Sequence, residues 1–178
     1  MKRFIFPLFS LLGAGLLLSG CSAPKIQTAV PDIDKSFSAE AELSYGKDSC
    51  TVQMRRFGEN SWEFCVTEPF PLEGLIITVN DGETKLTMYD MESLADVSEE
   101  AVSAARLITD AFEAAIDNKE NAAASEGIIT LTGQAPTCTY TLTIDEKGTP
   151  TGLTIGGRGV SAEFTKFVEM EEEAEIVT

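Results

Sequence analysis

Apolar and polar residues alternate along several short stretches of this 178-residue chain, in the period of two that is typical of half-buried β-strands. In residues 37–45 every second residue is apolar, and the residues between them are serine or glutamate. Turn-forming residues, above all Gly, Pro, Asn and Asp, separate the stretches. The pattern predicts nine strands, at 37–45, 50–54, 62–67, 75–80, 85–89, 127–132, 137–144, 153–155 and 160–168.

The period changes between the fifth and sixth predicted strands. Apolar residues there recur every three or four positions, which is typical of an amphipathic helix; they are Val102, Ala105, Ile108, Phe112, Ala115 and Ile116. Ser98 is a favourable N-cap, and Glu99 and Glu100 stand in the first turn, where the helix dipole favours acidic side chains. We expect one helix of about 18–20 residues. Its end and a loop should occupy the polar, alanine-rich segment 117–125.

The order of five strands, one helix and four strands predicts the fold. Strands with one apolar face and a helix with an apolar stripe must cover one another, and a sheet of about nine strands should curl. We therefore expect an α+β fold, in which a curved antiparallel open half-barrel sheet wraps round one long helix over residues 37–170. A three-residue loop at 58–60 would set Met54 opposite Phe64 and Val52 opposite Val66.

The N-terminal end has the features of an export signal. Lys2 and Arg3 precede an apolar stretch of about 15 residues, which is short for a membrane span of roughly 20 residues. The run Leu18-Ser19-Gly20-Cys21 resembles the lipobox of bacterial lipoproteins. The resemblance implies cleavage before Cys21 and acylation of that residue. A plain signal peptide and an uncleaved anchor are the alternatives.

These features predict the organisation of the whole chain. Residues 1–20 would be a lipoprotein signal peptide, and residues 21–36, with two prolines, a tether. The domain would follow, and residues 171–178 would form a solvated acidic tail. We expect an extracytoplasmic protein, lipid-anchored to the bacterial cell membrane through Cys21.

Charge and composition exclude several classes of function. A formal net charge of −16 repels nucleic acid and anionic lipid head groups, so attachment to the membrane should come from acyl chains on Cys21. The chain contains no histidine, which excludes Ser-His-Asp and Cys-His catalysis and every histidine-ligated metal site. The acidic residues form no spaced motif, and Ser61 and Ser161 have no visible base. The sequence therefore predicts that the protein is not an enzyme and has no cofactor and no metal.

The cysteines do not form a disulfide framework. With Cys21 acylated, the odd number of three remains: Cys50, Cys65 and Cys138. Strand parity predicts that Cys50 points inward and Cys65 outward, which disfavours a bridge between them. A bridge between Cys50 and Cys138 stays open. The absence of a CxxC spacing argues against a three-cysteine metal site.

Two segments resemble a known family. Residues 56–69 (RFGENSWEFCVTEP), and Asp81-Gly82 followed by Met88-Tyr89-Asp90, are similar to the central hairpin of LolA/LppX-like lipoprotein carriers. The resemblance spans roughly residues 37–90. It implies a half-barrel that holds acyl chains or other apolar ligands between a concave sheet and its helices. This chain departs from the family in showing one clear helix, and in an anchor that the soluble carrier lacks.

Two functions follow from these observations. The first is binding of an apolar ligand, a lipid or acyl chain, between sheet and helix. The residues predicted to line that site are Val52, Met54, Trp62, Phe64, Ile108, Phe112, Tyr140 and Phe164. The second is a structural or protein-interaction lipoprotein that contacts an envelope protein and takes no small ligand. In that case the same residues simply pack the core, and a filled interior favours it.

Overall fold

The computed structural model describes residues 31–89, 91–94 and 100–170, in which eleven strands form one sheet with every neighbouring pair antiparallel. The strands are β1 (Phe37–Tyr45), β2 (Asp48–Gly58), β3 (Ser61–Glu68), β4 (Ile76–Asn80), β5 (Glu83–Met88), β6 (Met91–Leu94), β7 (Ala123–Ser125), β8 (Ile128–Gln134), β9 (Thr139–Ile144), β10 (Pro150–Gly156) and β11 (Val160–Glu169). The helices are η1 (Phe70–Leu72), α1 (Glu100–Asp117) and η2 (Lys119–Asn121).

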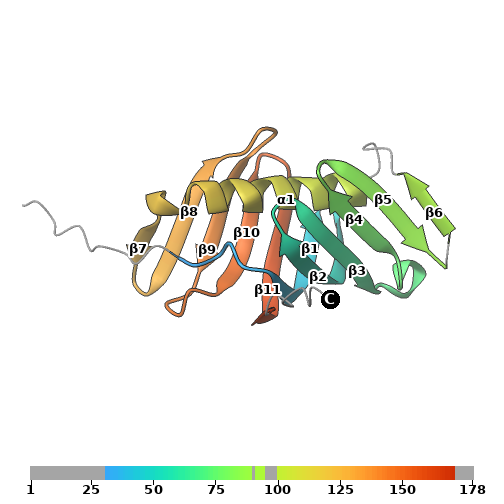
Figure 1. The fold of residues 1–178 in the computed structure, drawn as a ribbon, viewed down its shortest axis with the longest axis horizontal. Helices are drawn as coiled ribbons and strands as arrows, with labels where there is room; N and C mark the ends of the chain where they lie inside the picture. The colour runs from blue at the N-terminus through green and yellow to red at the C-terminus, as the bar shows by residue number, and fades with distance from the viewer. Residues whose placement is uncertain (1–30, 90, 95–99, 171–178) are drawn as a thin grey trace, which may run out of the picture.

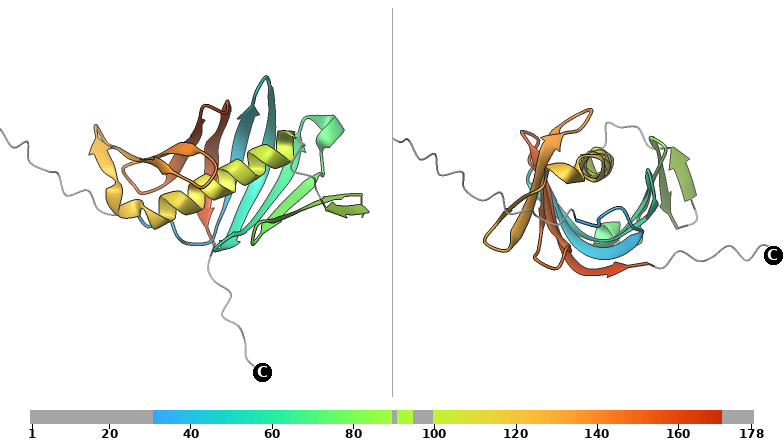
Figure 2. Two further views of the ribbon diagram at one scale, coloured as in Figure 1. Left: turned by 90° about the horizontal axis from the view of Figure 1, so that it is seen from above. Right: turned by 60° about the vertical axis from the view of Figure 1, so that its left-hand side comes forward.

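Two meanders make up the sheet. Its order is β6-β5-β4-β3-β2-β1-β11-β10-β9-β8-β7, so each meander follows the chain from neighbour to neighbour. The first and last strands, β1 and β11, pair at the centre, with Phe37 opposite Glu169 and Tyr45 opposite Val160. The two meanders form the two walls of a curved sheet (Figure 2).

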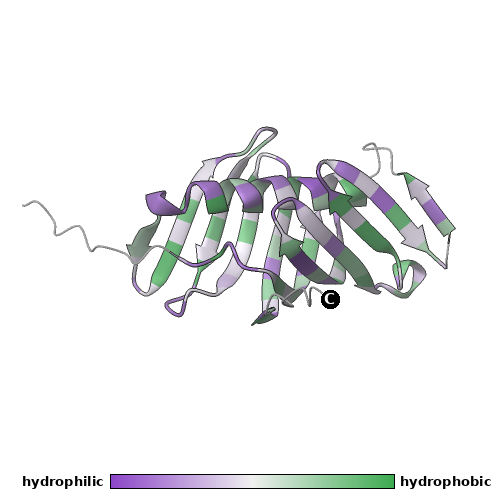
Figure 3. Cartoon of the chain, in the orientation of Figure 1, coloured by the Kyte–Doolittle hydropathy of each residue, from purple (hydrophilic) through white to green (hydrophobic). Residues whose placement is uncertain are grey.

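Helix α1 crosses the strands on the concave side of the sheet (Figures 1 and 2). Hydrophobic and hydrophilic positions alternate along the strands (Figure 3), so the sheet presents an apolar face to the helix. In residues 101–117 only Asp117 is exposed, because the walls enclose the helix on both sides. Six alanines in α1 keep its surface small and let the strands approach closely.

Several predictions about the fold are confirmed. The curved antiparallel sheet wraps round one α-helix of 18 residues, and the first strand occupies the predicted residues. Met54 pairs with Phe64, and Val52 with Val66. Asp81 and Gly82 both have positive φ, as the tight hairpin between β4 and β5 requires.

The predicted number of strands is wrong, because the sequence pattern does not reveal β6 and β7. All four residues of β6 are exposed, so β6 has no buried alternate positions that a pattern could reveal. Strand β7 has three residues and lies in segment 117–125, where the pattern predicts a helix end and a loop. The helix does end there, at Asp117, but η2 and β7 follow it. Ser98, Glu99, Cys21, the signal segment and the acidic tail lie outside the described residues.

The three described cysteines are free thiols. Cys50 is buried and Cys65 is half-buried on the opposite face of the sheet, as parity predicted. Cys138 is buried beside β9, which three strands separate from β2. Four strand spacings amount to about 19 Å, far beyond the reach of a disulfide. The Cys50–Cys138 bridge is therefore excluded, and burial raises the pKa of both thiols.

Candidate functional site

The eight side chains predicted to line a ligand site all lie on the concave side of the sheet, around α1. They come from β2, β3, β9, β11 and the helix, and each is at most 7% exposed. The structure thus brings all of them together. They are buried against one another and against the helix, so α1 and its neighbours fill this part of the interior.

Phe112 of α1 lies at the centre of an aromatic cluster. Its ring centroid is 5.3 Å from those of Phe37 and Trp62, and 6.2 Å from that of Phe164. The contacts with Trp62 and Phe164 are edge-to-face, the geometry that the ring quadrupole favours. Phe37 was not among the predicted lining residues, although its inward parity in the first strand was visible. The cluster joins the helix to β1, β3 and β11.

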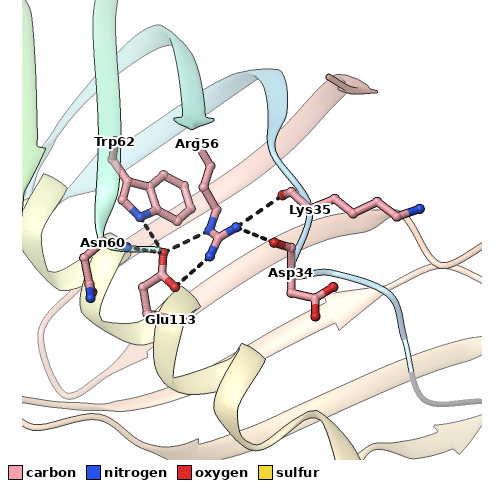
Figure 4. Close-up of polar contacts among 6 residues, drawn as sticks. All are labelled: Asp34, Lys35, Arg56, Asn60, Trp62 and Glu113. Carbon is pink, nitrogen blue, oxygen red and sulfur yellow. Dashed lines mark hydrogen bonds and ion pairs between the residues drawn. The ribbon is translucent and has the colours of Figure 1, made fainter. Parts of the chain in front are cut away.

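A charged pair borders this cluster. The Arg56 guanidinium donates from Nε and Nη2 to the two carboxylate oxygens of Glu113, both at 2.9 Å (Figure 4). Trp62 Nε1 donates to Glu113 Oε1 at 2.7 Å, and the backbone N–H of Asn60 donates to the same oxygen at 3.3 Å. The Arg56 side chain is 3% exposed and that of Glu113 14%. We call this the Arg56–Glu113 clamp; it joins β2 and β3 to α1.

The same arginine holds the segment that leads into β1. Arg56 Nη1 donates to the backbone oxygens of Asp34 at 2.5 Å and Lys35 at 3.4 Å (Figure 4). Lys119 of η2 donates to Asp34 Oδ2 at 2.7 Å, and this contact lowers the pKa of Asp34. Ile33 is 3% exposed. Segment 32–36, the last part of the predicted tether, is therefore attached to the domain.

Sequence reasoning missed the clamp and its contacts with segment 32–36. The sequence does contain one indication of the clamp, because Arg56 shares the inward parity of Val52 and Met54 in the second strand. A charged residue at such a position requires a partner of opposite charge. Glu113 follows Phe112 on the helix, but the sequence does not show that the two side chains meet across 57 residues.

Two further polar contacts hold the second half of α1. The Tyr140 hydroxyl donates to the Ala114 oxygen at 2.9 Å, and Thr137 Oγ1 donates to Asp110 Oδ2 at 3.2 Å. Burial raises the pKa of Tyr140, so the hydroxyl stays protonated as a donor. Gly133 lies opposite Tyr140, and a methyl group there would overlap the tyrosine ring and hydroxyl.

The first half of α1 is held differently. In the described part of the chain, no side-chain hydrogen bond joins residues 101–109 to the sheet, and Thr109 Oγ1 donates within the helix to the Arg106 oxygen. Val102, Ala105 and Ile108 are almost completely buried. Within the described ranges, this half of the helix is therefore attached to the sheet by apolar contacts.

Apolar side chains become progressively more exposed toward the β5–β6 edge of the concave face. Leu86 lies opposite the buried Ile77, so it faces inward, and Met88 has the same parity. Met91 pairs with Met88 and is 69% exposed. The buried Thr84 hydroxyl, further along β5, has no hydrogen-bond partner among the residues that the structure describes. Half-buried and exposed apolar side chains thus continue the core to the edge of the sheet.

Two surface depressions are polar and lie outside this apolar region. One, of about 400 Å³, lies at the clamp and is lined by Asp34, Ser36, Arg56, Gly58, Glu59, Asn60, Glu113, Ile116 and Asp117. The other, of about 670 Å³, lies beside η1 and includes Glu42, Glu68 and Glu73. In the described ranges no His, Cys, Asp or Glu side chains gather in a metal-binding group, and no helix there has the length and apolarity to cross a membrane.

Solved structures resemble this chain in part of their fold. An uncharacterized conserved protein from Thermus thermophilus matches with a TM-score of 0.44 and 10% identity, over 78% of this chain and 80% of its own. A LolA superfamily protein from Nitrosomonas europaea matches with a TM-score of 0.43 and 10% identity, over 80% and 89%. No known family profile and no curated protein matches the sequence. The function must therefore be argued from the geometry of this chain.

Proposed function

We propose that this protein is an extracytoplasmic lipoprotein that binds an apolar ligand, a lipid or acyl chain, between its sheet and helix α1. One observation carries the proposal: the first half of α1 fills the apolar concave face of the sheet, here called the groove, and among the described residues only apolar contacts hold it there. Such contacts have no fixed direction, so an acyl chain can replace them at little cost once the helix moves aside. The polar contacts of the second half would keep the helix attached.

The apolar side chains at the β5–β6 edge support the same proposal. Met88, Met91 and Leu86 extend the apolar surface from the buried core to solvent beside β6. Methionine is unbranched and polarizable, and it adapts to ligands of varied shape. An acyl chain would approach over this edge and lie along the groove of residues that the sequence identified.

The anchor belongs to the proposal as well. Cys21 would be acylated and would hold the domain at the outer face of the bacterial cell membrane. Replacing Cys21 with alanine should abolish labelling with radioactive palmitate and release the chain into the soluble fraction. Continued labelling of that variant would contradict the anchor.

An interaction module without a small ligand is the second candidate. The burial of all eight predicted lining residues favours it, because the interior at those positions is filled. Phe70, Tyr89 and Leu94 are 77–84% exposed and could contact an envelope protein. Uptake of an acyl ligand separates the two candidates.

The test compares two substitutions on one strand. Met91 faces the groove and Leu94 the opposite side, and both are largely exposed. We expect cis-parinaric acid to bind the natural chain, Met91→Asp to weaken binding about tenfold, and Leu94→Asp to leave it unchanged, since burying a charge beside an acyl chain is costly. Native mass spectrometry should show one bound acyl chain. If the natural chain takes up no acyl ligand, the interaction module is the better assignment.

A further inference from the structure

Arg56 connects two parts of the chain that no other described residue joins in this way. Its Nε and Nη2 bind Glu113 of α1, and its Nη1 binds the Asp34 and Lys35 oxygens. Asp34 also reaches η2, directly after the helix, through Lys119. We propose that segment 32–36 controls the attachment of α1: docking of the segment and the bond between Arg56 and Glu113 stabilise each other. The inference rests on the proposed function in taking the second half of α1 as the attachment of a helix whose first half covers the ligand site.

The burial of Arg56 explains why the two contacts are coupled. A guanidinium keeps its charge, so Arg56 at 3% exposure requires partners for its donors. If α1 leaves, Arg56 loses its counter-ion and favours water, and it then releases the oxygens of Asp34 and Lys35. If the segment leaves, the Nη1 donors of Arg56 lose their partners. The arginine side chain then also moves toward water, which weakens its bond to Glu113. Coupling of this kind acts equally in both directions.

Segment 32–36 lies between the predicted anchor and the domain, so a pull on the anchor would reach the segment before it reaches α1. Ile33 is seated in the core, and the residues before it lead toward the predicted anchor at Cys21. Residues 22–31 can span at most about 36 Å. A displacement of the domain relative to the membrane would therefore act first on Ile33 and Asp34. The polar cleft at the clamp lets water reach Arg56 when these contacts open.

Hydrogen exchange of the full chain tests the first direction. Ile33→Ala with Lys119→Ala weakens the attachment of the segment without altering Arg56 or Glu113. We expect amide exchange in residues 105–116 of α1 to rise about tenfold relative to β9 and β10 in the same sample. The matched control is Leu43→Ala with Lys166→Ala, which removes an equally large buried side chain from the core face of β1 and an exposed ion pair with Glu40. Exchange in α1 that stays unchanged, or that rises only in step with β9 and β10, would overturn the proposal.

Thiol labelling tests the reverse direction. In a chain carrying Ile33→Cys, peptide mass spectrometry measures how fast position 33 takes up maleimide. Glu113→Gln should raise that rate about tenfold, because it removes the counter-ion of Arg56, and Glu120→Gln should leave it unchanged. An unchanged rate with Glu113→Gln would refute the coupling. Neither experiment uses a ligand, so their failure leaves the ligand proposal standing, and a failure of acyl-chain uptake leaves the coupling standing.

Discussion

The two halves of α1 lie in the same groove but are attached to it by different forces. Residues 110–117 combine the aromatic cluster with the Arg56–Glu113 clamp and the Tyr140 hydrogen bond. Among the described residues, 101–109 rely on apolar contacts, beside the wall that ends at the β5–β6 edge. Directional polar bonds fix one half of the helix in one position, whereas apolar contacts tolerate substitution by another apolar surface. The difference makes the second half an attachment and the first half a movable cover.

The largest expected effect is at the centre of the attached half. Phe112→Ala removes a fully buried ring that contacts three other aromatic rings. We expect the free energy of unfolding in urea to fall by about 3–5 kcal/mol. Phe57→Ala, at a ring that is 52% exposed, should change it by less than about 0.5 kcal/mol. Similar losses for the two variants would show that the cluster is not a principal attachment.

Removal of the acid in the clamp should have the next largest effect. Glu113→Ala leaves the Arg56 guanidinium buried without its counter-ion and Trp62 without its acceptor. We expect a loss of about 2–3 kcal/mol, because hydrogen bonds to charged groups are strong and an unpaired buried charge is costly. Glu120→Ala is the control, since that side chain is exposed. A loss below about 0.5 kcal/mol for Glu113→Ala would mean that the clamp does not hold the helix.

A substitution at Gly133, which lies against the Tyr140 ring, tests the hydrogen bond from Tyr140 to the Ala114 oxygen. Gly133→Ala places a methyl group where the tyrosine ring lies, and the displaced hydroxyl can no longer reach the Ala114 oxygen. We expect a loss of about 1–3 kcal/mol in thermal or urea unfolding. In a Tyr140→Ala background the same substitution should cost much less. A double-mutant cycle with no coupling energy would contradict this interpretation of the glycine.

The comparison predicts uneven opening within the natural helix. Amides of residues 105–109 should exchange about tenfold faster than those of residues 112–116, because local opening follows the weaker attachment. Native-state hydrogen exchange resolved by nuclear magnetic resonance measures both sets in one sample. Equal exchange in the two halves would mean that α1 moves as one unit.

The smallest effect is expected at a buried hydroxyl. Thr84 Oγ1 lacks a partner in the described part of the chain, so Thr84→Val should leave stability unchanged or raise it by up to about 1 kcal/mol. Thr109→Val is a matched control, because that buried hydroxyl donates to the Arg106 oxygen and its loss should cost about 1 kcal/mol. A clear loss with Thr84→Val would show that the hydroxyl has a partner in solution.

Much of the fold could be predicted from the chain because burial imposes a period. The alternation in residues 37–45 predicted β1, and the inward parity of Met54 and Phe64 predicted their pairing. Strand β6 could not be predicted in this way, since its four residues are exposed and only backbone pairing with β5 defines it. Parity likewise placed the eight candidate residues inside. It could not reveal whether helix or ligand covers them, which depends on the position of α1.

The clamp illustrates what a one-dimensional pattern omits. Arg56 stands at an inward position among apolar residues, and its partner lies on an element that packs only in three dimensions. The attachment of segment 32–36 is equally hidden, because it depends on backbone oxygens that carry no sequence signal. The sequence therefore predicted the apolar part of the site, and the structure added the polar contacts that hold it.

The central pairing of β1 with β11 has a consequence for how the chain folds. Each meander joins strands that are close in sequence, so both can form early through local contacts. The pairing of β1 with β11, the central seam, instead joins residues from the two ends of the domain, such as Phe37 and Glu169. Closing so long a loop is slow. We therefore expect the middle of the sheet to be completed last. Until then the aromatic cluster that spans the seam would lie open, and newly made chains would be most prone to aggregate.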